Sequence, residues 1–178
     1  MAKISRKMTA DKTLIQTPKF QVIEREFSNG AASMICHPGA AVILPFLDSS
    51  RICMITNHRK TVDANLVELP AGTLDLNERP METAQRELAE ETGFIAEHME
   101  PLFDYYVSPG IMDEKMHAFL ATQLKRGEQN LMPDETIEPM IVYFSEALNW
   151  IKTGRIQDAK TIATLLYYDK FGNNPSGH

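Results

Sequence analysis

A helix with an acidic face, predicted between residues 72 and 94, constrains this chain more than any other segment. The sequence there is GTLDLNERPMETAQRELAEETGF. Pro80 suits the first turn of a helix, where its missing N–H costs nothing, and Gly93 suits the position just past the last turn. We therefore expect a helix that begins near Pro80 and is stopped by Gly93.

Three carboxylates gather on one side of this predicted helix. Glu87 precedes Glu90 and Glu91 by three and four positions, so all three project from about one face and repel one another. Arg86, the one base inside the cluster, cannot neutralise three acids. A hard cation such as Mg²⁺ can, because it takes oxygen ligands from carboxylates and from substrate phosphates. The alternative is an ordinary surface helix with a solvated acidic face.

The spacing of seven residues in this stretch resembles the Nudix box, the signature of the Nudix hydrolases. The matching residues are Gly72, Glu78, Arg86, Glu87, Glu90, Glu91 and Gly93. The resemblance implies an enzyme that cleaves a nucleoside diphosphate linked to a further group, using a divalent metal, Mg²⁺ or alternatively Mn²⁺. It does not identify the further group.

Two segments outside the box resemble the ADP-ribose pyrophosphatase branch of the family. They are ELPAG at residues 68–72 and Ser108-Pro109-Gly110, which is followed by Asp113-Glu114. The resemblance implies that Pro109 and Gly110 bind substrate. GDP-mannose hydrolases of the same superfamily can also carry this tripeptide, and Pro-Gly commonly makes a plain turn, so both alternatives stay open.

The resemblance also implies roles for the box residues. Glu87 and Glu91 are expected to be the main metal ligands, with Glu90 contributing and the carbonyl of Ala71 completing the site. Glu87 and Glu90 thereby act in catalysis. Glu78 supports the box or is a solvated loop acid, and Arg86 is expected to be a structural counter-ion that fixes the carboxylate rotamers.

The general base and the substrate contacts are expected elsewhere in the chain. Resemblance to ADP-ribose pyrophosphatases points to Glu135, in the stretch MPDETIEP, with Glu114 as the alternative base. Arg59 resembles a phosphate-contacting arginine, and Glu68 resembles a glutamate that contacts the ligand or a second metal. The aromatic residue that stacks on adenine is left open among Phe20, Phe27, Tyr105 and Tyr106, and the histidines form no recognisable constellation.

Composition limits the partners. A net charge of -6 and a pI near 5.4 argue against nucleic acid, whose polyanionic backbone rewards basic surfaces. Two cysteines form neither a metal motif nor a disulfide framework, which favours a reducing compartment. No apolar run approaches the length of a membrane span, and residues 1–12 lack the apolar core that is expected of a secretory signal. We expect a cytoplasmic protein that binds a small nucleotide sugar.

The order of apolar runs and turn signals suits an α/β (α+β) fold with a mixed sheet covered by helices. The resemblance implies the same architecture, a Nudix-type mixed sheet sandwiched between helices. Runs 21–27 and 32–36 predict a short N-terminal antiparallel hairpin, and runs 40–46 and 52–56 predict adjacent core strands. Further strands are predicted at 66–69, 102–107, 115–122 and 140–144. Two later helices are expected, one capped by Ser145 and ending at Thr153 before Gly154, and one capped by Asp158 and running to about Lys170.

We divide the chain into an N-terminal segment and hairpin (1–37), a Nudix domain (38–171) and a flexible tail (172–178). The resemblance implies that the hairpin helps to form a homodimer. The predicted function is Mg²⁺-dependent hydrolysis of ADP-ribose to AMP and ribose 5-phosphate. The alternatives are hydrolysis of another nucleoside diphosphate sugar, such as GDP-mannose, and a non-catalytic Nudix domain that senses a nucleotide.

Overall fold

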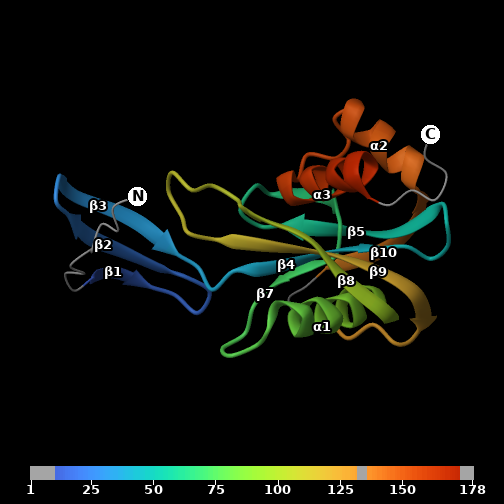
Figure 1. The fold of residues 1–178 in the computed structure, drawn as a ribbon, viewed down its shortest axis with the longest axis horizontal. Helices are drawn as coiled ribbons and strands as arrows, with labels where there is room; N and C mark the ends of the chain where they lie inside the picture. Colours follow the sequence, from blue (N-terminus) through green and yellow to red (C-terminus); the bar gives the residue numbers. More distant parts are fainter. Residues whose placement is uncertain (1–10, 132–135, 173–178) are drawn as a thin grey trace.

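The computed structural model describes residues 11–131 and 136–172, and its central strands lie between two layers of helices (Figure 1). Helix α1 (Pro80–Thr92) covers one side, while α2 (Phe144–Lys152) and α3 (Ala159–Phe171) cover the other. The predicted mixed sheet sandwiched between helices is confirmed. None of the described helices is long and apolar enough to cross a membrane.

The central strands form two sheets. A mixed sheet has the order β7 (Ala71–Thr73), β4 (Ala40–Pro45), β9 (Lys115–Arg126) and β8 (Phe94–Tyr106). In it β4 runs parallel to β9, from Ala40 opposite Met116 to Pro45 opposite Ala121. An antiparallel sheet has the order β10 (Ile137–Tyr143), β5 (Arg51–Arg59) and β6 (Ala64–Glu68).

Strands β4 and β5 are both core strands, as predicted, but they are not neighbours in one sheet. Both edges of β4 are already paired, with β7 and with β9. The two strands pack together in the same core, and an isolated bridge joins Phe46, the residue after β4, to Ile52 of β5. The predicted strands 66–69, 102–107, 115–122 and 140–144 correspond to β6, β8, β9 and β10, whereas the short strand β7 was not predicted.

Strand β4 supplies both hydrophobic cores. All of its residues are buried, and alternate side chains point to opposite faces. Val42 and Leu44 join the core beneath α2 and α3, while Ala41 and Ile43 join the core beneath α1. Each side chain the size of Leu or Ile contributes about 1.5–3 kcal/mol when it is fully buried. The strand thus fixes both helical layers to the sheet.

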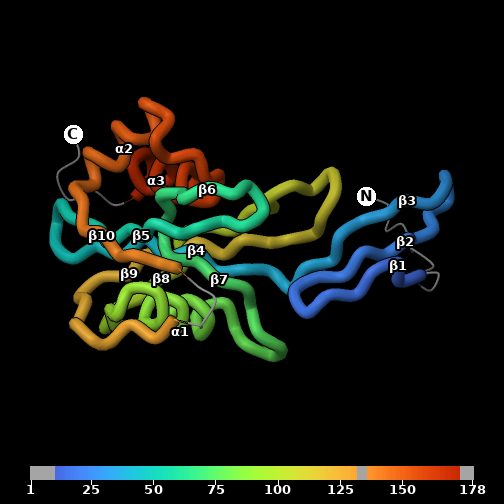
Figure 2. The backbone as a smooth tube through the Cα atoms, turned by 180° about the vertical axis from the view of Figure 1, so that it is seen from behind, coloured from blue at the N-terminus to red at the C-terminus, as the bar shows by residue number. Residues whose placement is uncertain are grey.

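A third sheet stands at one end of the molecule (Figures 1 and 2). It consists of β1 (Lys12–Gln16), β2 (Gln21–Phe27) and β3 (Gly30–Cys36), all antiparallel. The predicted hairpin is confirmed as β2 and β3. Strand β1 was not predicted, because all of its residues are exposed and no buried face imposes an alternating pattern on them.

The predicted helix ends are confirmed for α1 and partly for the later helices. Gly93 ends α1 in the left-handed conformation, with φ of 69°, which glycine adopts without steric cost. Asp158 caps α3 by accepting a hydrogen bond from Thr161 N. The prediction that Ser145 caps α2 is wrong: the helix already begins at Phe144, and its N-cap residue makes no side-chain cap.

The apolar residues of α3 are not all buried. Leu165 is fully buried and Ile162 is partly buried against the same core, but Leu166 is 46% exposed. The predicted flexible tail lies almost entirely outside the described residues, which end at residue 172.

Candidate active site

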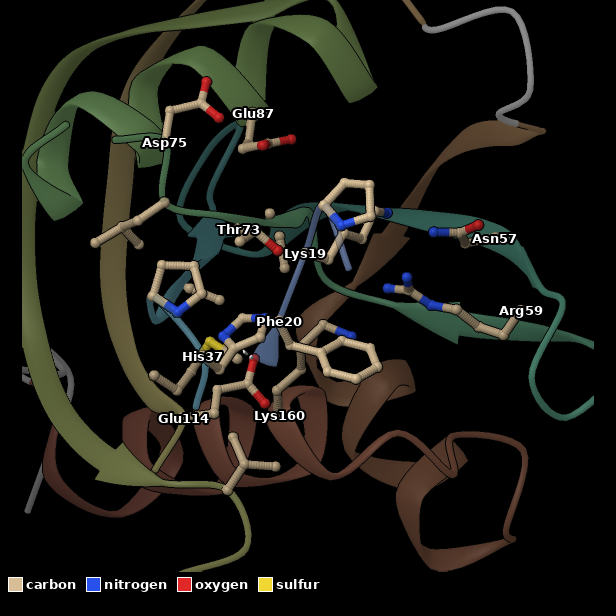
Figure 3. Close-up of a pocket in the computed structure, with 18 of the residues that line it drawn as sticks. Lys19, Phe20, His37, Asn57, Arg59, Thr73, Asp75, Glu87, Glu114 and Lys160 are labelled. Atoms are coloured by element: carbon tan, nitrogen blue, oxygen red, sulfur yellow. Dashed lines mark ion pairs between the residues drawn. The ribbon is translucent and has the colours of Figure 1, made fainter. Parts of the chain in front are cut away.

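A cavity of about 1400 Å³ lies between the N-terminal sheet and the central strands (Figure 3). Its wall is built from the turn between β1 and β2, from β5 and β6, from β7 and the loop after it, from α1, and from the first turn of α3. The cavity brings together residues that are far apart in the sequence. Both acidic and basic side chains line it.

The acidic wall of the cavity consists of Glu87, Glu90 and Glu91 on α1. Gly72 on β7 allows the backbone to approach this helix closely. A Cβ atom placed on Gly72 would lie only 1.8 Å from Oε1 of Glu87. No other residue fits at position 72 while the Glu87 carboxylate keeps its place.

Glu91 is the most buried acid of this wall, with 5% of its surface exposed. Its Oε2 accepts a hydrogen bond from the backbone N–H of Ala71 at 2.9 Å. Burial raises the pKa of Glu91 to about 8, and the negative charge of Glu87 adds to this rise, against the opposing effect of that hydrogen bond. A buried carboxylate of this kind is favoured as an anion only when a cation lies nearby.

Arg86 connects the acids of α1 to the preceding loop. One terminal nitrogen donates to Glu87 Oε1 at 2.6 Å and to Glu90 Oε2 at 3.1 Å. Nε and the other terminal nitrogen donate to the two oxygens of Glu78, at 3.0 and 2.9 Å. These bonds from Arg86, with a further bond from the Thr83 hydroxyl, lower the pKa of Glu78 to about 2. Arg86 therefore orients three carboxylates at once.

The acidic wall offers oxygen donors, which suit a hard divalent cation. Within residues 11–131 and 136–172, however, no three His, Cys, Asp or Glu side chains already converge as a metal site. Arg86 and the Ala71 N–H hold the carboxylates instead. The buried Glu91 and the cradle that Gly72 forms for Glu87 fit such a cation. Glu87, Glu90 and Glu91 are the residues that could hold it.

The basic wall is organised around Glu68, which is completely buried. Arg59 donates to both of its oxygens, at 2.8 and 2.5 Å. Lys160, from the first turn of α3, donates to Glu68 at 2.5 Å and lies 2.9 Å from Asp158. Lys160 was not predicted from the sequence, because it lies 92 positions from Glu68 and belongs to no motif. Only the packing of α3 against β6 reveals it.

The remaining predicted site residues do not all lie at the cavity. Glu114 lines the cavity, and its carboxylate lies 3.5 Å from Nδ1 of His37, a histidine to which no role was assigned. Pro109 and Gly110 are exposed and do not line the cavity of a single chain. Glu135 lies outside the described residues.

Of the four aromatic candidates for adenine stacking, only Phe20 lines the cavity. It lies directly before β2 and is 37% exposed. Tyr105 packs against the core beneath α2 and α3, and its hydroxyl is buried. Phe27 and Tyr106 lie outside the cavity lining.

Comparison with known proteins found relatives that match most of the chain. Residues 37–165 match the NUDIX domain model. The chain is 40% identical over 147 residues to an ADP-ribose pyrophosphatase of Bacillus subtilis (strain 168), covering 80% of each chain. It is 38% identical over 154 residues to a methanol dehydrogenase activator of Bacillus methanolicus, covering 84% of this chain and 83% of the relative.

Two further matches are more distant. A GDP-mannose pyrophosphatase of Escherichia coli O139:H28 is 35% identical over 138 residues, covering 72% of each chain. The crystal structure of an ADP compounds hydrolase superposes with a TM-score of 0.78 at 20% identity, covering 98% of this chain and 99% of that one. At this identity the structural match establishes the fold.

Proposed function

The chain belongs to the Nudix family, and from that premise we propose that it hydrolyses the diphosphate of ADP-ribose to AMP and ribose 5-phosphate. The proposal depends on one observation: an acidic wall and a basic wall line the same cavity. Figure 3 shows Glu87 on one side of it and the side chains of Arg59 and Lys160 on another. A diphosphate needs both walls, because a cation held by the acids and the fixed cations of the protein share its negative charge.

Each wall has its own task in this reaction. Mg²⁺, or Mn²⁺, held by Glu87, Glu90 and Glu91 and by the Ala71 carbonyl would offset the charge that develops on the phosphoryl oxygens. Arg86 keeps Glu87 and Glu90 in position. Arg59, held by Glu68 in a bidentate pair, is positioned to bind a phosphate oxygen.

A base must accept a proton from the attacking water. We assign this role to Glu135, with Glu114 as the alternative. Glu114 lines the cavity, and the neighbouring His37 lies within 3.5 Å of its carboxylate. Replacing each glutamate by glutamine in turn decides between them, because the variant of the true base loses most of its turnover while its substrate affinity changes little.

ADP-ribose is the preferred substrate because the ADP-ribose pyrophosphatase relative has higher identity and coverage than the GDP-mannose pyrophosphatase relative. Phe20 is proposed to stack on the purine, since it presents a ring to the cavity. Pro109 and Gly110 contribute to substrate binding in this proposal only from the neighbouring subunit of a dimer. GDP-mannose remains the second candidate, with the same chemistry at the diphosphate.

A regulatory role is the third candidate, because one relative is named as an activator of methanol dehydrogenase. A non-catalytic Nudix domain would sense a nucleotide and act on a partner protein. The complete set of box glutamates favours catalysis, since a domain that only binds has no need of all of them.

We further propose that the chain forms a homodimer through the N-terminal segment, residues 1–37, with residues 38–171 as the Nudix domain. The N-terminal sheet exposes Leu14 and Ile15, at 44% and 55%, and it stands apart from the helical layers (Figure 2). A cytoplasmic location is proposed from the two free cysteines.

The decisive experiment is a hydrolysis assay with ADP-ribose, GDP-mannose, NADH and diadenosine polyphosphates, with and without Mg²⁺. We expect Mg²⁺-dependent release of AMP and ribose 5-phosphate from ADP-ribose. The kcat/KM for ADP-ribose should be the highest among the compounds of the panel. Glu87→Gln is the control, and it should lose most of the turnover while keeping its fold. A preference for another compound overturns the substrate, and absence of any cleavage favours the regulatory role.

A further inference from the structure

Asn57 on β5 is a buried amide in the wall of the cavity. Only 8% of its surface is exposed, and it is one of the residues that line the cavity. Other side chains of β5 form hydrogen bonds within the described part of the chain, namely those of Arg51, Cys53, His58 and Arg59. No described residue forms one with the side chain of Asn57.

The amide of Asn57 still reaches the cavity, since the Tyr105 hydroxyl is the fully buried side-chain group of the described residues that has no hydrogen-bond partner. An amide that bonds to no described residue adds nothing to the packing of β5 that an apolar residue of similar size would not supply. The amide is therefore poorly explained as a structural residue of β5. It is explained if a bound molecule supplies the missing partner.

The surroundings of Asn57 indicate which group that partner is. Asn57 and Arg59 are two positions apart on one strand, so both side chains point to the same face. Figure 3 shows them next to each other, both directed into the cavity. Arg59 and Lys160, both paired with Glu68, present cationic groups on this side, while the box carboxylates lie on α1. An anionic group that bridges the two walls would therefore lie next to Asn57.

We propose that Asn57 is a substrate-positioning residue whose amide N–H donates a hydrogen bond to a non-bridging oxygen of the substrate's diphosphate, beside Arg59. The inference rests on the proposed function, since it requires a nucleoside diphosphate in this cavity. The amide adds a donor without adding charge, so it orients the diphosphate and leaves the balance between the two walls unchanged.

Two substitutions separate this role from a structural one. Asn57→Leu removes both the donor and the acceptor. Asn57→Asp keeps the shape of the side chain but replaces the donating NH₂ by an anionic oxygen, which repels phosphate. Asn65→Leu is the matched control, because Asn65 is an exposed residue of β6 outside the cavity lining.

The test measures the free energy of unfolding without ligand and the Kd for ADP in the presence of Mg²⁺. Asn57→Leu is expected to be as stable as the unmodified chain or more stable, and to bind ADP about tenfold or more weakly, as the loss of a hydrogen bond to a charged group predicts. Asn57→Asp is expected to bind ADP at least as weakly as the leucine variant. Asn65→Leu should leave the Kd unchanged.

Three results would overturn the inference. The first is an Asn57→Leu variant that is less stable but binds ADP normally, because the amide then has a structural partner. The second is normal affinity in Asn57→Asp. That result would mean that the side-chain oxygen accepts a hydrogen bond from a hydroxyl group of the ligand, and that no amide N–H donates to a phosphate oxygen. The third is an unmodified chain that does not bind ADP. If the chain binds ADP but cleaves no nucleotide sugar, the proposed function fails, and the Kd values of the variants still decide the role of Asn57.

Discussion

At the scale of single residues, Gly72 and Glu87 act as a pair. Gly72→Ala places a methyl group where the Glu87 carboxylate now lies, so the carboxylate must move. We expect a loss of turnover of about 100-fold or more, because displacement of a metal-binding group by about 1 Å is enough for such a loss. The fold should tolerate the change, since only the end of a flexible side chain has to shift. Steady-state kinetics and thermal unfolding measure the two effects.

A double-mutant cycle tests the cause of this effect. Any loss of stability caused by Gly72→Ala should disappear in the Glu87→Ala background, where no carboxylate opposes the new methyl group. An equal loss of stability in both backgrounds would show that the alanine strains the backbone of β7 and not the position of Glu87.

Glu78 is a single residue that makes the stability of the fold depend on pH. Hydrogen bonds from Arg86 lower its pKa from 4.5 to about 2, so folding favours the ionised form. The resulting stabilisation is present above pH 4.5 and is lost as the pH falls from about 4.5 towards 2. Glu78→Gln should therefore be less stable than the unmodified chain at pH 7, and the difference should vanish near pH 2. Urea unfolding across this range measures it, and a difference independent of pH would contradict this account.

At the scale of secondary structure, the features that were predicted correctly are those that depend on the spacing of residues within one segment. The helix from Pro80 to Thr92 and its acidic face follow from the pattern within one short segment, because side chains three and four positions apart share a face. The contact between Lys160 and Glu68 was not predictable, since it depends on the docking of α3 against the end of β6. The backbone N–H of Leu69 donates to Thr161 Oγ1 at 2.8 Å in the same contact.

Helix α3 therefore contributes to the site as well as to the core. Lys160→Met leaves the buried Glu68 with Arg59 as its remaining cation, and removal of one partner of a buried ion pair costs about 3–5 kcal/mol. We expect a loss of stability towards the lower end of this range, because Arg59 still holds both oxygens of Glu68. Urea unfolding measures it. Lys170→Met, an exposed position of the same helix, is the control and should change stability by less than about 0.5 kcal/mol.

At the scale of the whole molecule, the sequence predicted the fold class but not how the strands divide into sheets. The run 40–46 is buried on both faces, so its pattern identifies a core strand and says nothing about its neighbours. Strand β1 was missed for the opposite reason, since it buries nothing. The neighbours of β4 and the pairing of β1 both depend on contacts between distant segments, which form only in the folded molecule.

The exposed face of the N-terminal sheet leads to a prediction about assembly. If Leu14 and Ile15 are covered by a second copy of the chain, the double variant Leu14→Glu, Ile15→Glu should be monomeric at concentrations where the unmodified chain is a dimer. Sedimentation equilibrium distinguishes the two states. Ile141→Glu, at a 48% exposed position of β10 outside this sheet, should remain dimeric. A monomeric unmodified chain would refute the dimer.

Metal binding should stabilise the whole molecule, because a ligand that binds only the folded state shifts the unfolding equilibrium by mass action. At a Mg²⁺ concentration of about 100 times the Kd, the gain is about 2.7 kcal/mol. Glu87→Gln should lose most of this gain, because the neutral amide is a poor ligand for Mg²⁺. Any loss of stability that comes from the weakened contact with Arg86 is present in the metal-free chain as well, so the measurement with EDTA separates it. Thermal unfolding with Mg²⁺ and with EDTA measures both values. An equal gain in the variant would mean that Mg²⁺ acts elsewhere on this acidic chain, and the assignment of the acidic wall would then be wrong.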